Sequence, residues 1–327
     1  MNQKTKILIT GAGGFIGSHL VEQCVEAGHK VRAFVHYNAR NFHGWLEASP
    51  YYGELEVVSG DIRDYDSVVA AAEGCETVFH LAALIGIPYS YVSPQAYIRT
   101  NVEGTYNVLQ ACRTLRTPNI LVTSTSETYG SAQYVPIDEK HPAVGQSPYA
   151  ATKIAADQLA ISYHRSFGLP VKIVRPFNTY GPRQSARAII PTVISQILAG
   201  KRELSLGNLS PTRDLTFVRD TAAGFLAVAN HNGFFGEPVN IGMGGEISIS
   251  DLVLKIAELM GVSIQTTAAA ERQRAAASEV ERLLADASKL RGATGWTPEY
   301  DLERGLQETI DWLKVHNGAY KPDLYNV

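Results

Sequence analysis

Tyr149 and Lys153 lie four residues apart in the sequence SPYAATK, a spacing that brings two side chains to one face of a helix. A tyrosine hydroxyl, with an ordinary pKa of about 10, is a weak base at neutral pH, and a nearby ammonium group lowers that pKa. We expect Lys153 to lower the pKa of Tyr149, so that Tyr149 can take a hydroxyl proton while a hydride leaves the same carbon. The pair therefore predicts redox chemistry at an alcohol carbon.

The sequence TSE at 125–127 adds three polar side chains to this predicted centre. Thr125 ends a predicted strand, and its hydroxyl can hydrogen-bond the substrate oxygen on which Tyr149 acts. Glu127 is either an ordinary surface carboxylate or a base for a carbon-bound proton, which simple alcohol oxidation does not need. Ser126 could relay a proton through water. The predicted catalytic residues are Thr125, Ser126, Glu127, Tyr149 and Lys153.

A glycine-rich turn near the N-terminus predicts a dinucleotide site. Gly11, Gly14 and Gly17 follow a β-branched run at 6–10 and precede a helical pattern at 15–27. In such a turn the glycines allow a tight bend, a close approach to pyrophosphate and close packing of the helix on the strand. A positively charged nicotinamide ring bound there would help to lower the pKa of Tyr149. The alternative is an ordinary turn between a strand and a helix.

The end of the second predicted strand, at 30–35, leaves the cofactor open between NAD and NADP. Val35 stands where NAD enzymes carry an acidic residue for the adenosine ribose. His36 or Arg40 could contact a 2′-phosphate, whereas Asn38 could hold an unphosphorylated ribose. The predicted cofactor-binding residues are Gly11, Gly14, Phe15, Ile16, Gly17, His36, Asn38, Arg40, Asp61, Ile62, Leu81, Ala82, Ala83, Tyr149 and Lys153.

Strand and helix patterns alternate through the first half of the chain, which predicts an α/β fold with a doubly wound parallel (Rossmann) sheet. We place this dinucleotide-binding domain at 1–176. The expected strands are 6–10, 30–35, 55–61, 77–83, 119–125 and 171–176, and the expected helices are 15–27, 66–74, 97–115 and 149–167.

The alternation stops after residue 176, which predicts a smaller, interleaved substrate-binding lobe at 177–216 and 243–327. Residues 217–242 are expected to return to the first domain as a helix and an added strand. The lobe is expected to contain a helix at 189–199, a hairpin-like segment at 203–218, an element at 247–261, a helical stretch at 268–289 and a helix at 301–316.

The composition indicates an ordinary globular protein. A formal net charge of -3 without a basic run gives no sign of nucleic-acid binding. The N-terminus shows no signal sequence, and no apolar run is long enough for a membrane span. Cys24, Cys75 and Cys112 lack metal-ligand spacing, so we expect reduced, buried thiols in a cytoplasmic protein and no metal site.

Motifs along nearly the whole chain resemble the extended short-chain dehydrogenase/reductase family of sugar-nucleotide enzymes. In that family 4-epimerases usually lack an acid after the threonine, and dTDP-glucose 4,6-dehydratases carry Thr-Asp-Glu. GDP-mannose 4,6-dehydratases and UDP-glucuronate decarboxylases carry Thr-Ser-Glu, as at 125–127. The motifs are GAGGFIG (11–17), HLAA (80–83), NVEGT (101–105), TSETYG (125–130), SPYAATK (147–153) and RPFNTYGPR (175–183).

Two further segments, 178–192 and 278–283, look most like nucleotide-sugar 4,6-dehydratases of legionaminic-acid-type pathways. The resemblance implies a GDP- or UDP-linked hexose or N-acetylglucosamine as substrate, with a tightly bound NAD or NADP that is regenerated in each cycle. It also implies a role in polysaccharide biosynthesis and a homodimer in which helices 97–115 and 149–167 form a four-helix bundle. The implied substrate-binding residues are Asn178, Arg213 and Arg274, with Arg187 and Arg183 as weaker candidates; the alternative for Arg274 is a solvated helix residue.

The resemblance also implies a reaction sequence. Tyr149 takes the C4 hydroxyl proton as hydride passes from C4 to the cofactor, Glu127 removes the C5 proton beside the new ketone, the C6 hydroxyl leaves as water, and hydride returns to C6. The acid for the C6 hydroxyl is either Glu127, handing on the proton it has taken, or Ser126 through a water. The alternatives are a UDP-glucuronate decarboxylase, a sugar 4-epimerase and, more remotely, a non-catalytic NAD(P)-binding regulator. Basic residues for a sugar carboxylate are not evident in the sequence, which favours the dehydratase.

Overall fold

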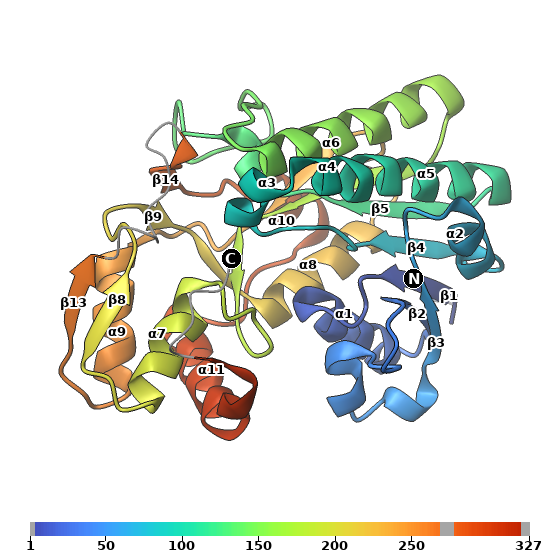
Figure 1. Ribbon diagram of the computed structural model, residues 1–327. Helices are drawn as coiled ribbons and strands as arrows, with labels where there is room; N and C mark the ends of the chain where they lie inside the picture. The colour runs from blue at the N-terminus through green and yellow to red at the C-terminus, as the bar shows by residue number, and fades with distance from the viewer. Residues whose placement is uncertain (1–3, 269–277, 322–327) are drawn as a thin grey trace.

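A seven-stranded, fully parallel sheet forms the centre of the molecule (Figure 1). The computed structural model describes residues 4–268 and 278–321. The sheet order is β11-β6-β5-β4-β1-β2-β3, as expected for a doubly wound fold with one added strand. Its strands are β1 (Lys6–Thr10), β2 (Lys30–His36), β3 (Glu56–Gly60), β4 (Thr77–His80), β5 (Asn119–Thr123), β6 (Val171–Pro176) and β11 (Pro238–Ile241).

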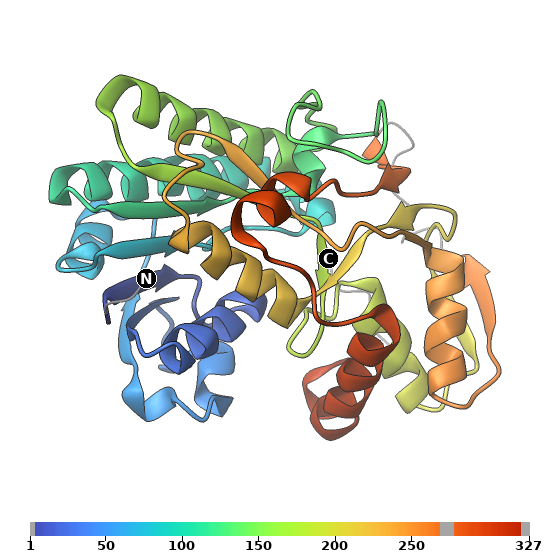
Figure 2. The same cartoon turned by 180° about the vertical axis from the view of Figure 1, so that it is seen from behind.

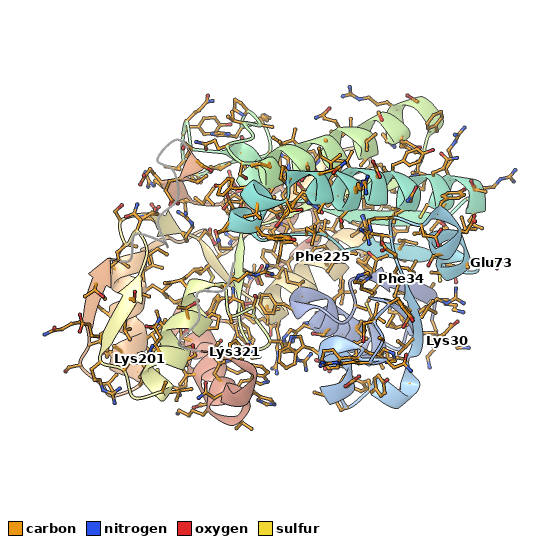
Figure 3. All side chains as sticks on the ribbon, in the orientation of Figure 1. Lys30, Phe34, Glu73, Lys201, Phe225 and Lys321 are labelled. Carbon is orange, nitrogen blue, oxygen red and sulfur yellow. The ribbon has the colours of Figure 1, made fainter. Side chains whose placement is uncertain are left out.

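Helices cover both faces of the sheet because its strands are apolar on both faces. In β1, Ile7 and Ile9 join the hydrophobic core under α1 and α8, whereas Leu8 joins the core under α2, α5 and α6. Phe225 and Phe34 lie in the interior, one in each of these cores (Figure 3). The covering helices are α1 (Phe15–Glu26), α8 (Val218–Asn230), α2 (Tyr65–Ala72), α5 (Gly104–Leu115) and α6 (Pro148–Phe167).

The second part of the chain packs around a hydrophobic core of its own, beside the carboxyl ends of the sheet strands (Figure 2). It contains α7 (Ile189–Leu198), α9 (Ile249–Leu259), α11 (Leu302–His316), β8 (Glu203–Leu206) and β13 (Gln265–Ala268). Short strands join it to the first part: β7 (Asn178–Tyr180) with β10 (Leu215–Phe217), and β9 (Thr212–Arg213) with β12 (Ile247–Ser248) and β14 (Arg282–Leu283). The remaining helices are α3 (Ile87–Val92), α4 (Pro94–Tyr97) and α10 (Ser288–Thr294).

Two expectations about this second part are wrong. Residues 203–218 do not form a hairpin, because β8 pairs in parallel with β13, while β9 and β10 pair with other strands. Residues 278–287 do not form a helix, and Arg282 and Leu283 pair with β9 instead. In both segments, partners distant in sequence outweigh the local preference. The rest of the stretch predicted as helical, at 269–277, lies outside the described residues.

The three cysteines are buried and unpaired, as predicted. Within the described residues, no helix combines the length and the apolarity needed to cross a bilayer.

Candidate active site

The N-terminal turn of α6 positions Tyr149 and Lys153. Ser147 caps the helix by accepting a hydrogen bond from the backbone N–H of Ala150 at 3.1 Å, and Pro148 occupies the first helical position. Tyr149 and Lys153 are both buried, and Lys153 Nζ donates a hydrogen bond to the Thr123 carbonyl at 2.6 Å. The ammonium group is therefore anchored to the end of β5, one helical turn from the tyrosine.

The pKa of Tyr149 shifts in the direction opposite to our expectation. Burial is the largest effect and raises the pKa, and the charge of Glu127 raises it further, while a hydrogen bond with Thr125 lowers it. Burial also lowers the pKa of Lys153 to about 8, against the charge of Asp157, which raises it. The protein alone thus holds Tyr149 protonated, and positive charge brought into the site is needed to make it a base.

The segment that follows β5 places Thr125 and Glu127 beside this pair. Thr125 caps a 3-10 turn (Ser126–Tyr129) by accepting a hydrogen bond from the backbone N–H of Glu127 at 3.2 Å. The strand ends at Thr123, two residues earlier than predicted, so Thr125 belongs to the turn and not to the sheet. Ser126 is buried, and Glu127 is partly buried. Thr125, Ser126 and Glu127 therefore lie at the carboxyl edge of the sheet, where ligands bind in open α/β folds.

The glycine turn has the close contacts that a phosphate-binding turn requires. Gly11 has a φ of +71°, and a Cβ there would lie 2.8 Å from the backbone nitrogen of Ala82. A Cβ on Gly17 would lie 2.2 Å from the Gly11 carbonyl oxygen. Gly14 begins α1 without a side-chain cap, and no acidic residue lies in the first turn. The N–H groups at this helix terminus are therefore available to an anion.

A single cavity of about 1140 Å³ joins the glycine turn to the catalytic residues and to the second part of the chain. All five predicted catalytic residues line it, as do all predicted cofactor residues except Arg40, which is exposed. Asn178, Arg187 and Arg213 line it as well. Arg274 lies outside the described residues. The fold thus gathers residues that are more than 200 positions apart around one space.

Asn38 has a structural task that the sequence did not suggest. Its side-chain oxygen accepts from the backbone N–H groups of Arg40 and Phe42, both at 3.1 Å. Its amide nitrogen donates to the carbonyl oxygens of His36 and Phe42 at 3.3 and 2.7 Å. These four bonds use the hydrogen-bonding capacity of the amide, so the prediction that Asn38 holds the ribose gains no support from the geometry.

The loop at 36–45, which the Asn38 hydrogen bonds hold together, crosses the glycine turn. A Cβ on Gly13 would lie 2.5 Å from the His43 carbonyl oxygen, and a Cβ on Gly44 would lie 2.3 Å from the Gly13 carbonyl oxygen. Trp45 donates its backbone N–H to the same Gly13 oxygen at 3.0 Å, and its ring meets Trp312 of α11 edge-on at 5.2 Å. Sequence reasoning missed this loop, because only the tertiary contact shows why glycine is needed at both crossing points.

Several charged side chains that line the cavity form ion pairs. Asp61 accepts hydrogen bonds from Arg63, whose guanidinium holds the pKa of that carboxyl below its usual range. Arg213 is buried, lines the cavity and pairs with Glu279 at 3.4 Å. Glu279 itself lines the cavity and was not predicted. It is one of two acidic residues in the segment SEVERL, which gives no local signal that could have found it.

The two candidate arginines near 185 separate in the structure. Arg187 is exposed, lines the cavity and donates to Ser185 Oγ at 3.2 Å. Arg183 pairs with Glu22 of α1 at 2.8 Å and does not line the cavity. The structure thus separates two candidates that the sequence ranked equally, because Arg187 lines the cavity and Arg183 does not.

The sequence model of the GDP-mannose 4,6 dehydratase family matches residues 8–309. The chain belongs to this family. The dTDP-glucose 4,6-dehydratase of Streptomyces antibioticus is 32% identical over 97% of this chain and 94% of its own length. A putative UDP-glucose 4-epimerase of Methanocaldococcus jannaschii is also 32% identical, over 95% of this chain and 99% of its own length.

Solved structures agree with this membership in the GDP-mannose 4,6-dehydratase family. DesIV, a dTDP-glucose 4,6-dehydratase from Streptomyces venezuelae solved with NAD and TYD bound, matches with a TM-score of 0.86 at 29% identity. The match covers 97% of this chain and 99% of DesIV. These relatives include both dehydratases and an epimerase. Their names do not identify this chain as a legionaminic-acid-type enzyme.

Proposed function

We propose that this protein is a nucleotide-sugar 4,6-dehydratase that converts a GDP- or UDP-linked hexose or N-acetylglucosamine into its 4-keto-6-deoxy derivative. The observation that carries the proposal is Glu127, a carboxylate in the same cavity wall as Tyr149 and Lys153. An epimerase has no need of a base for a carbon-bound proton at this position, whereas elimination of water does.

The glycine turn fits an adenine dinucleotide for two reasons. Its backbone leaves no space for a Cβ at Gly11 or Gly17, and the uncapped start of α1 lines the cavity. Gly11, Gly14 and Gly17 would hold the pyrophosphate, and the loop at 36–45 would cover it. We propose NAD as the cofactor, by analogy with DesIV. A nicotinamide ring bound beside Tyr149 would supply the hydride acceptor for C4 and the hydride donor for C6.

Tyr149 is the proposed base for the C4 hydroxyl. Thr125 hydrogen-bonds the phenol, and Lys153, held on the Thr123 carbonyl, supplies the nearby positive charge. The partly depressed pKa of Lys153, about 8, leaves it mostly charged at neutral pH. A charged ammonium stabilises the phenolate that forms when the substrate binds.

Glu127 is the proposed group for the elimination step. Once C4 is a ketone, the C5 hydrogen is acidic, and the Glu127 carboxylate can remove it. Among the described residues that line the cavity, the other two carboxylates are Asp61, which pairs with Arg63, and Glu279, which pairs with Arg213. Glu127 carries the proton that it has just taken from C5, so we propose that it passes this proton to the leaving C6 hydroxyl, with buried Ser126 orienting the leaving group.

The second part of the chain, at 177–216 and 243–327, is the proposed nucleotide-sugar lobe. Arg213 and Arg187 lie in the cavity wall, where cationic groups can bind the diphosphate. The amide oxygen of Asn178 is buried without a hydrogen-bond partner and is therefore suited to accept a bond from a substrate hydroxyl.

A mass-spectrometric panel tests the proposal. Purified protein is incubated with GDP-, UDP-, CDP- and dTDP-linked glucose, mannose and N-acetylglucosamine, and with UDP-glucuronate. The expected product is lighter than its substrate by one water, with no net NADH. An isomer of unchanged mass would identify an epimerase, and loss of carbon dioxide from the uronate would identify a decarboxylase.

Glu127→Gln separates the two chemical steps. The variant keeps the shape of the side chain but removes the base, so we expect dehydration to slow by about 10²–10⁴-fold, while C4 oxidation persists as transient NADH absorbance. In D₂O, deuterium uptake at C5 should fall in parallel. Glu279→Gln is the matched control, because it makes the same change in another carboxylate of the cavity, one that pairs with Arg213, and should raise KM without abolishing dehydration. Unimpaired dehydration by Glu127→Gln would remove Glu127 from the mechanism.

We also propose that two copies associate through α5 and α6. Tyr106 and Phe167, on these helices, are 46% and 49% exposed, and the two helices lie side by side on one face of the sheet (Figure 1). An exposed aromatic face on paired helices is suited to an isologous four-helix contact. Light scattering coupled to size exclusion should give the mass of a dimer, and Tyr106→Glu should give a monomer.

A further inference from the structure

His80, the last residue of β4, has both ring nitrogens hydrogen-bonded in the interior, one to Thr10 just before the glycine turn and the other to Thr105 at the start of α5. We infer that His80 is a positioning residue, locked as the neutral Nε2–H tautomer. Through Nδ1 it fixes the backbone of Leu81 and Ala82 beside the glycine turn, which we call the cofactor wall. Through Nε2 it fixes Asn101 and Leu84 next to Tyr149, which we call the roof. This inference rests on the cofactor and the reaction proposed above, although its structural part can be tested without them.

The Nδ1 side of the ring fixes the cofactor wall. Thr10 Oγ1 accepts hydrogen bonds from the backbone N–H groups of Leu81 and Ala82, both at 3.1 Å. Both donors face the lone pairs of the hydroxyl, with the Leu81 N–H shared with the Thr10 carbonyl at 3.2 Å, so the single hydroxyl proton of Thr10 points to His80 Nδ1 at 2.8 Å. Nδ1 must then be an acceptor without a proton. The amide of Ala82 that is fixed in this way is the backbone atom against which Gly11 turns.

The Nε2 side of the ring fixes the roof. Thr105 Oγ1 donates its proton to the Asn101 carbonyl at 2.7 Å, so it accepts at 3.1 Å from His80, whose Nε2 must carry the proton. The Asn101 side chain accepts from the Leu84 N–H and donates to the Leu84 carbonyl, both at 2.9 Å. Asn101 lies in a π-helical turn (Ile98–Glu103), a widening that often marks functional positions.

The roof contacts the catalytic tyrosine directly. Leu84 packs against a small cluster of Ile87, Tyr97 and Tyr149, in which the Tyr97 and Tyr149 rings meet edge-on at 6.3 Å. The Asn101 amide also donates to Thr152 Oγ1 at 3.1 Å, and Thr152 lies on α6 about one turn after Tyr149. The same imidazole is therefore connected to the wall beside the glycine turn and to the packing around Tyr149.

This network is compatible only with a neutral ring. A second proton on Nδ1 would face the Thr10 hydroxyl proton, whose oxygen has no lone pair left to accept it. In agreement, burial lowers the pKa of His80 to about 3, and the charge of Lys153 lowers it further. His80 should therefore not titrate in the pH range in which the enzyme works.

Two side-chain amides separate the two functions of the ring. In His80→Asn the amide can take the place of Nδ1 and accept from Thr10, but it is too short to reach Thr105. In His80→Gln the amide can take the place of Nε2 and donate to Thr105, but it leaves the Thr10 proton unpaired. Thr10→Val and Thr105→Val remove the same two links from the other side.

We expect His80→Gln and Thr10→Val to weaken NAD binding about tenfold, with kcat at saturating NAD nearly unchanged, as loss of one buried hydrogen bond implies. We expect His80→Asn and Thr105→Val to lower kcat about tenfold, with NAD affinity nearly unchanged. Backbone hydrogen exchange should accelerate at Ala82 in the first pair and at Leu84 in the second. If both pairs impair both properties equally, His80 only fills space and the inference is overturned.

Nitrogen NMR of the imidazole tests the tautomer independently of any reaction. We expect one protonated and one unprotonated ring nitrogen, assigned to Nε2 and Nδ1, without change between pH 5 and pH 9. A proton on Nδ1, or titration near the ordinary histidine pKa, would refute the inference. Absence of dehydration in the sugar-nucleotide panel, with the NMR and exchange results as expected, would refute the proposed reaction and leave the positioning network intact.

Discussion

Removal of the Arg175 guanidinium should cost more stability than removal of its whole ion pair. Arg175, at the end of β6, donates to Asp157 Oδ2 through Nε at 3.1 Å and Nη2 at 2.8 Å, and Ser124 donates to the same oxygen at 2.8 Å. Both charged side chains are almost fully buried, at 6% and 1% exposure. Asp157 lies one turn beyond Lys153 on α6, so this pair fastens the catalytic helix to the sheet.

The magnitude follows from what each variant leaves behind. Asp157 Oδ1 is buried without a hydrogen-bond partner, so Arg175→Leu leaves a carboxylate with the Ser124 hydroxyl as its remaining bond. Breaking a buried pair in this way costs about 3–5 kcal/mol, whereas replacing both partners with apolar groups is often close to neutral. For a chain of 327 residues, that cost corresponds to a fall in Tm of about 4–7 °C.

Thermal and urea unfolding at pH 7 measure the difference. Arg175→Leu should show the full loss, and Arg175→Leu combined with Asp157→Leu should recover at least half of it. Ser124→Ala removes one neutral hydrogen bond to the same oxygen and should cost only about 1 kcal/mol. If the double variant is less stable than Arg175→Leu, the uncompensated Asp157 charge is not the cause of the loss, and the reasoning fails.

Three further predictions concern the turn, the buried histidines and a buried lysine. Gly11→Ala should weaken NAD binding at least tenfold in a fluorescence titration, since its Cβ would meet a backbone nitrogen, while Gly74→Ala, with a similar φ of +74° and open space, should bind normally. Burial lowers the pKa of His19 to about 4 and of His80 to about 3, so only the unfolded chain takes up protons as pH falls below 6.5. The free energy of unfolding obtained from urea titrations should therefore fall between pH 6.5 and pH 4, by about 3 kcal/mol per histidine, and a flat profile would contradict this. Lys172 donates to three backbone carbonyls at the end of α8, so Lys172→Met should cost roughly 2–4 kcal/mol in urea unfolding, and a loss below about 1 kcal/mol would contradict that role.

The sheet and its order were predictable because local signals agree along the first half of the chain. The apolar run at 6–10 matches β1, and the pattern at 171–176 matches β6 residue for residue. The return of 237–242 to the sheet is also confirmed, since β11 pairs with β6. Strands that are buried on both faces must be apolar throughout, and this requirement is written in the sequence.

The second part of the chain was less predictable. Its short strands pair with partners far away in sequence, as β8 with β13 and β9 with β14, and neither pattern nor propensity specifies such partners. The Ala-rich composition of 278–287 favours a helix, yet the pairing with β9 decides its conformation. Short strands carry too little local information to select among distant partners.

The types and spacing of the reactive residues were set by the sequence alone: a glycine turn, Thr125 with Glu127, and Tyr149 one helical turn before Lys153. Only the tertiary structure decided how these groups are tuned. Burial raises the pKa of Tyr149 where its neighbour Lys153 had suggested the opposite, and Asp61 and Glu279 form ion pairs with Arg63 and Arg213. Residue types follow from the chain, but desolvation and ion pairing depend on what the fold brings within a few ångströms.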